Sequence, residues 1–99
     1  MEVIETPHML GEKQKHIQKL TSFENTTIVN IQLEKEEIIL EHDVDADVII
    51  IVKKGKVTFK VDRKTVQLTP ENMLHMKPKE KHSLKAEEAS DLIVMQIKP

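Results

Sequence analysis

The chain has 99 residues, with 15 Lys and Arg against 17 Asp and Glu, no cysteine, and two Phe as its only aromatic side chains. This length suits one domain with a single core. The near balance of charge argues against nucleic-acid binding, which normally requires a basic excess on one face. The absence of cysteine excludes disulfides, cysteine-ligated zinc and thiol nucleophiles, and it suits a reducing cytoplasm.

Neither end nor middle of the chain predicts a membrane or secretory segment. Residues 1–10 include Glu2 and Glu5 and contain no apolar run of the kind found in signal peptides. The longest apolar run, residues 48–52, is far shorter than the roughly 20 residues that cross a bilayer. We therefore expect a soluble cytoplasmic protein with no membrane partner.

The first 25 residues are weakly patterned, whereas the rest of the chain is strongly patterned. Ile17 and Leu20 are the main apolar positions of a possible edge strand, so we expect residues 1–25 to form an N-terminal arm or edge strand. From Thr26 onward, short apolar runs are interrupted by turn residues roughly every ten positions, which is typical of a β-sandwich or barrel. We expect residues 26–99 to form one β-barrel domain.

Eight strands are predicted in this domain. They are expected at residues 26–33, 38–42, 48–52, 57–61, 65–68, 73–76, 82–86 and 92–97. The segment 57–61 alternates strictly between apolar and polar residues, whereas 48–52 is apolar at every position and must be covered on both faces. No segment has a sustained helical stripe. The fold class is predicted to be all-β.

Two histidine-containing segments carry a family resemblance. His42 precedes a run that ends at Gly55, and residues 71–82 contain Pro78 and end at His82. From about residue 34 to 97, the order and separation of these features resemble the small single-domain cupins, whose motifs are G-x5-H-x-H-x(3,4)-E-x6-G and G-x5-P-x-G-x2-H-x3-N. The resemblance implies a double-stranded β-helix, or jelly-roll barrel, that commonly forms a homodimer.

The resemblance also implies a degenerate metal site. Metal-binding cupins use three His and one Glu, but here the second His position falls on Val44 and the Glu position on Val48. Strand alternation predicts that His42 faces the same side as Ile38 and Leu40, with Val48 on the face of Ile50. The residues that we expect to line the barrel pocket are His42, Val44, Val48, Ile50, His82 and Leu84.

Only two of the four ligand positions, those of His42 and His82, would still carry a metal-binding side chain. His42 and His82 would need a further ligand from Asp45, Asp47, His75 or water, because a stable transition-metal site generally has three or four ligands. Such a site would hold Fe, Mn, Ni or Zn. The competing interpretation is that the two imidazoles are bonded to backbone carbonyls or to each other and hold no metal.

The sequence therefore favours a non-catalytic cupin that binds a small molecule or serves as an interaction module, without a cofactor. The alternative is a metal-dependent dioxygenase, isomerase or decarboxylase acting on a small organic acid or sugar. A third hypothesis is the ligand-binding domain of a regulator. We also expect a homodimer in which Ile49 and Ile51 are covered outside the barrel, because residues 48–52 are apolar on both faces.

Overall fold

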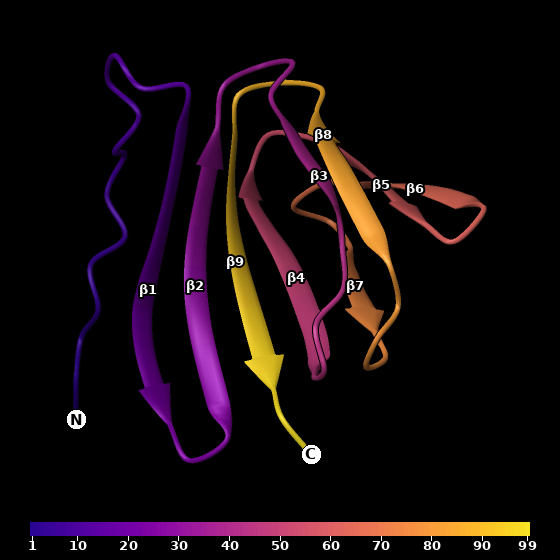
Figure 1. Ribbon diagram of the computed structural model, residues 1–99. Coiled ribbons are helices and arrows are strands. Elements are labelled where there is room, and N and C mark those ends of the chain that lie inside the picture. The colour runs from indigo at the N-terminus through magenta and orange to yellow at the C-terminus, as the bar shows by residue number, and fades with distance from the viewer.

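The computed structural model describes all 99 residues, which form nine strands and no helix (Figure 1). The chain thus offers no helix that could cross a lipid bilayer. The strands are β1 (Lys15–Phe23), β2 (Thr26–Leu33), β3 (Ile38–His42), β4 (Asp47–Lys54), β5 (Val57–Val61), β6 (Lys64–Leu68), β7 (Met73–Met76), β8 (His82–Ala86) and β9 (Ser90–Ile97). The eight strands expected from the sequence are all present.

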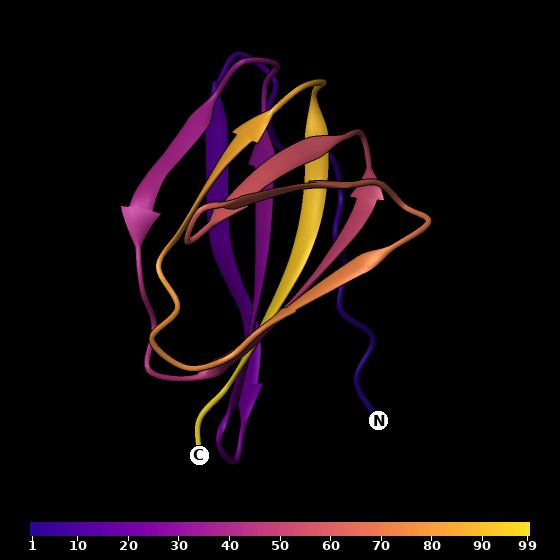
Figure 2. The same cartoon turned by 90° about the vertical axis from the view of Figure 1, so that its right-hand side faces the viewer.

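The strands form two antiparallel sheets that face each other as two layers (Figure 2). One sheet has five strands in the order β1-β2-β9-β4-β7, and the other has four in the order β3-β8-β5-β6. The neighbours are mostly far apart in sequence, as in the β4–β9 and β3–β8 pairs. This is the all-β jelly-roll architecture that the sequence predicts.

The core lies between the two sheets and consists of the inward half of each alternating strand. On β4, Val48, Ile50 and Val52 are at most 3% exposed, whereas Ile49 and Ile51 between them are half-buried on the outer face. Each aliphatic side chain buried in this way contributes roughly 1.5–3 kcal/mol to stability. The fully buried residues of the core cluster are Leu33, Val48, Ile50, Val52, Val57, Phe59, Leu68, Met76, Leu84, Ala86, Leu92 and Val94.

The outer face of the five-stranded sheet is partly covered by the N-terminal segment. Figure 2 shows this segment on the opposite side of the sheet from β3 and β8. Gln32, 1% exposed, accepts a hydrogen bond from the Met9 amide and donates one to the Pro7 carbonyl. Lys53 donates to the carbonyl and hydroxyl of Thr6. These bonds hold residues 6–9, which we call the N-terminal arm, against the sheet.

The rest of the N-terminal region forms strand β1 rather than a free segment. It pairs with β2 from Lys15 to Phe23, with one irregularity between Lys19 and Thr21, and lies at the edge of the five-stranded sheet. Ile17 on this strand is 56% exposed. Residues 1–25 thus contain both an arm and an edge strand.

Strand β3 departs from the alternation that the sequence predicts. The register with β8 shifts between Ile39 and His42, which is a β-bulge with an extra residue. Ile39 therefore shares the inward face with His42, whereas Ile38 and Leu40 are 49% and 79% exposed. The expectation that Ile38 and Leu40 face the same side as His42 is wrong, because simple period-two counting fails across a bulge.

Gly55 allows the β4–β5 turn to pass close to β9. Its φ of +95° lies in a region that side-chain-bearing residues rarely adopt. A Cβ atom here would also overlap the Ser90 hydroxyl and the Ala89 carbonyl. The Ser90 hydroxyl in turn accepts from the Lys56 amide and lies within hydrogen-bond distance of the Glu88 carbonyl oxygen, at 2.8 Å, and of the Lys56 carbonyl oxygen, at 3.2 Å, either of which can take its one proton. The turn is thereby fixed to the end of β9.

Candidate functional site

A cavity of about 240 Å³ lies between the two sheets and is the best candidate for a binding site. Ten of its thirteen lining residues are hydrophobic. The lining residues are Ile17, Val29, Ile31, Ile39, His42, Val44, Val48, Ile50, Phe59, His82, Leu84, Val94 and Gln96. All six residues expected from the sequence to line a pocket are among them, so the structure brings them together around one apolar space, which we call the apolar cavity.

Two histidines lie side by side at one part of this cavity. His42 and His82 are directly opposite each other in the β3–β8 register. Their ring centroids are 4.2 Å apart with the planes tilted by 59°. His82 is only 5% exposed and has Phe59 at a centroid distance of 6.5 Å, whereas His42 is exposed. His82 thus belongs to the cavity wall and His42 to its rim.

Both histidines form a hydrogen bond to a backbone carbonyl through Nδ1. Nδ1 of His42 lies 2.9 Å from the Leu40 carbonyl oxygen, and Nδ1 of His82 lies 3.1 Å from the Glu80 carbonyl oxygen. A carbonyl oxygen can only accept, so each Nδ1 must carry the proton. In the neutral ring, each Nε2 is then an unprotonated acceptor, and no protein group bonds to either one.

The environment of His82 favours its neutral form. Burial lowers the pKa of His82, and the charge of a protonated His42 would act in the same direction. The hydrogen bond to Glu80 and the carboxylates of Asp43 and Glu80 oppose this shift without reversing it. At neutral pH the cavity therefore presents an uncharged imidazole on its wall.

The donor groups do not fit the metal that the cupin resemblance implies. His75 Nε2 lies 2.8 Å from a carboxylate oxygen of Asp47, and both side chains are exposed on the outer face of β4 and β7. Asp45 is exposed in the β3–β4 loop. No group of three His, Cys, Asp or Glu side chains converges anywhere in the chain. None of the three candidate protein ligands thus joins His42 and His82.

Valine side chains stand at the two positions to which the cupin resemblance assigns further ligands. Val44 and Val48 both line the apolar cavity, and Val48 is 3% exposed. A hydrocarbon side chain cannot donate electrons to a metal, and two imidazoles alone fall short of the three or four ligands of a stable site. The chemistry available in this cavity is therefore hydrophobic contact together with hydrogen bonding at one end.

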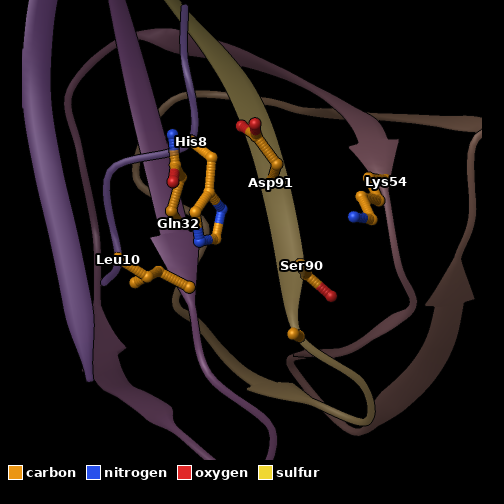
Figure 3. A pocket seen from close by; sticks show the side chains of 7 residues that line it. His8, Leu10, Gln32, Lys54, Ser90 and Asp91 are labelled. Carbon is orange, nitrogen blue, oxygen red and sulfur yellow. The ribbon is translucent and has the colours of Figure 1, made fainter. Parts of the chain in front are cut away.

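A second cavity of about 250 Å³ lies on the other side of the five-stranded sheet. Figure 3 shows His8 and Leu10 from the N-terminal region on one side of β9 residues Ser90 and Asp91, with Lys54 on the other side. Only two of its seven lining residues are hydrophobic. Asp91 is already paired with Lys53. We call this space the polar cavity.

Several residues that line the apolar cavity are not among the six predicted from the sequence. Val29 and Ile31 reach it from β2, and Val94 and Gln96 reach it from β9. Their alternation with outward-facing neighbours was visible in the sequence. The register that sets β9 between β2 and β4 was not, because it depends on pairing between distant segments.

The fold and the cavity together define a cupin-type β-barrel with an apolar interior. Solved structures with this fold include a conserved protein of unknown function from Streptococcus pyogenes, with a TM-score of 0.82 and 20% identity over 100% of this chain and 91% of that one. A cupin-superfamily protein from Desulfitobacterium hafniense has a TM-score of 0.81 and 15% identity, covering 87% of this chain and 79% of that one. At these identities the likeness shows the fold alone.

A third similar structure comes from a regulator. The Cupin_2 domain of an XRE-family transcriptional regulator from Enterobacter cloacae has a TM-score of 0.76 and 14% identity, covering 88% of this chain and 99% of that domain. Residues 38–98 match the AraC-like ligand binding domain family. The chain belongs to this family. A comparison with curated proteins finds no match.

Proposed function

We propose that this protein is a non-catalytic module that binds one small organic molecule in the apolar cavity. The observation that carries the proposal is the cavity itself, about 240 Å³ in volume, with ten hydrophobic residues among thirteen. Apolar cavities of about 150 Å³ are large enough to hold benzene in other proteins. A space of this size therefore suits a molecule with one ring or a short branched chain.

A cavity-filling pair of variants tests this proposal. Ile31→Phe on β2 would add volume inside the apolar cavity, whereas Ile28→Phe adds the same volume on the outer face of the same strand. We expect single-ring apolar compounds to raise the thermal unfolding temperature of the wild type and of Ile28→Phe, but not of Ile31→Phe. If no apolar compound stabilises the wild type, the proposal fails.

The family match favours a sensory use of this binding. The chain belongs to the AraC-like ligand binding domain family, and one similar structure is a domain of a transcriptional regulator. A ligand-binding domain acting with a separate DNA-binding partner is therefore our second candidate. Co-purification of a partner whose retention changes with a bound compound would support it.

We infer that the cavity works without a metal, so the alternative of a metal-dependent enzyme lacks support from the donor set. Metal content after purification without chelator is the direct measurement. We expect substoichiometric Fe, Mn, Ni and Zn, unchanged in His82→Ala. One tightly bound equivalent that is lost in His82→Ala would overturn this inference.

We also propose that a second copy of the chain covers the outer face of the five-stranded sheet. Ile49, Ile51 and Ile93 are half-buried on this face, and Met73 is 57% exposed beside them. The patch is continuous across β9, β4 and β7, because Ile51 pairs with both Ile93 and Met73. A self-complementary apolar face of this kind suits a twofold interface.

Light scattering coupled to gel filtration tests this part of the proposal. We expect the wild type to have about twice the chain mass of 11.4 kDa. Ile51→Glu should yield a folded monomer, whereas Lys54→Glu at the exposed end of the same strand should leave the dimer intact. A wild type that stays monomeric at high concentration would contradict the interface.

A further inference from the structure

The apolar cavity has one polar end whose hydrogen-bonding character is fixed by the backbone. Both Nδ1 atoms donate to carbonyl oxygens two residues earlier, at 2.9 Å for His42 and 3.1 Å for His82. Each interaction holds its ring in place and removes one nitrogen from use. What remains without a protein partner on each of these two lining residues is Nε2, which in the neutral ring accepts a hydrogen bond and cannot donate one.

A charged ligand is poorly matched to this end of the cavity. The cavity lining contains no Lys or Arg, so a carboxylate or phosphate would find no permanent positive charge. The charged groups that act on His82 from its own loop and from the neighbouring loop are the carboxylates of Glu80 and Asp43. An anion would meet two acceptors and this negative potential, which together disfavour it.

The rest of the cavity restricts the body of the ligand. Ile39, Phe59 and Leu84 come from the same sheet as the two histidines, while Val48 and Val94 face them from the other sheet. A polar atom placed among these side chains would lose its water without finding a partner, which costs about 1–3 kcal/mol. The body of the ligand should therefore be hydrocarbon or aromatic.

Resting on the proposed function, we propose that the ligand is an uncharged, compact apolar molecule with a single hydroxyl group, an alcohol or a phenol. The hydroxyl donates a hydrogen bond to the free Nε2 atom of His82 or His42. The apolar body fills the space between the sheets. The paired imidazoles therefore act as an acceptor site that distinguishes a hydroxyl-bearing molecule from an apolar molecule of the same shape and from a carboxylate.

Three probes of similar shape test this assignment on the full chain. They are p-cresol, which has a hydroxyl donor, p-fluorotoluene, which replaces that hydroxyl with a poor acceptor, and p-toluate, which carries a carboxylate. Dissociation constants would be measured by titration with nuclear magnetic resonance detection. We expect p-cresol to bind about fivefold more tightly than p-fluorotoluene, the difference expected for one hydrogen bond, and p-toluate to bind more weakly than either.

Two variants assign the effect to the imidazoles. His82→Phe and His42→Phe each keep a ring but remove an Nε2 acceptor, and His75→Phe changes an exposed histidine on the outer face. We expect one or both of the first pair to weaken p-cresol about fivefold while leaving p-fluorotoluene unchanged, and His75→Phe to change neither. Chemical shifts of residues lining the apolar cavity would show that each variant is folded.

The outcomes separate this inference from the function on which it rests. If p-cresol and p-fluorotoluene bind equally well, the cavity is a binding site but the acceptor assignment is wrong. If p-toluate binds most tightly, the histidines act as imidazolium ions and the assignment is also wrong. If none of the three probes binds, the proposed function fails together with the inference.

Discussion

The two cavities are nearly equal in size, yet the chain builds them in different ways. The apolar cavity of about 240 Å³ lies between the inward faces of both sheets, with the exposed side chains of Ile17 and His42 in its lining, whereas the polar cavity of about 250 Å³ lies between the N-terminal region and the outer face of one sheet. The first is therefore part of the folded core. The second is lined in part by His8 and Leu10, and the N-terminal arm is held there by its hydrogen bonds to Gln32 and Lys53.

The two cavities should therefore differ in the free energy needed to open them. Elements joined by many core contacts open only when the whole domain unfolds, whereas segments held by a few hydrogen bonds open at lower free energy. We therefore expect the apolar cavity to persist throughout the native ensemble. The polar cavity should open and close with the arm.

The largest expected effect comes from removing the aromatic wall of the apolar cavity. Phe59 is completely buried, and Phe59→Ala should lower the free energy of unfolding by about 3–5 kcal/mol. Urea unfolding followed by circular dichroism would measure this. Phe23→Ala, at a position that is 57% exposed, is the matched control and should cost far less. Similar losses for the two variants would contradict the assignment of Phe59 to the core.

A smaller and more local effect is expected from releasing the arm. Gln32→Ala removes three hydrogen bonds, to the Met9 amide, the Pro7 carbonyl and Asn30, and should cost about 1–3 kcal/mol. Hydrogen exchange at Met9 should become much faster, because its amide loses its acceptor. Binding of small molecules in the apolar cavity should not change.

The control for this experiment is Gln67→Ala, at an exposed position on β6. It should change neither stability nor exchange in the arm. If Gln32→Ala instead abolished binding in the apolar cavity, the two cavities would be coupled through β2. The comparison between a core cavity and an arm-dependent cavity would then be wrong.

The smallest effect concerns pH. Because burial lowers the pKa of His82 in the folded state, the unfolded chain binds the proton more readily. The contribution of neutral His82 to the free energy of unfolding is fully present above the pKa of this residue in the unfolded chain, about 6.5. It is lost as the pH falls from there toward the folded pKa. The wild type should thus lose more stability than His82→Gln between about pH 7.5 and pH 5.5.

Urea unfolding at both pH values would measure this difference. His8→Gln, at an exposed position, should behave as the wild type. Equal losses in the wild type and His82→Gln would show that His82 titrates alike in both states, contrary to its burial.

The sequence predicts the strands and most of the inward-facing residues because both depend on local alternation. The resemblance to the small cupins also predicts that His42 and His82 line one pocket, and both line the apolar cavity. The bulge in β3 could not be predicted, because it is defined by pairing with β8. Strict two-residue alternation along β3 therefore assigned Ile38 and Leu40 to the wrong face.

The burial of Gln32 under the N-terminal arm could not be predicted either, and the reason is different. On an alternating strand, a glutamine between apolar neighbours indicates a solvent-exposed face. Gln32 is nonetheless 1% exposed, because the N-terminal arm returns across the sheet and supplies its partners. Nothing in the weakly patterned first 14 residues indicates where they dock. Such contacts between distant segments leave no local periodicity.

The bulge in β3 has a further consequence for how the molecule meets other copies of itself. β3 is an edge strand of the four-stranded sheet, with Leu40 79% exposed on it. An irregular edge resists strand addition, which is how sheets grow into aggregates. β1 carries a similar irregularity, and β7 is only four residues long. Three of the four sheet edges are thus poor templates for strand addition, which leaves the sheet face as the surface for the self-association proposed above.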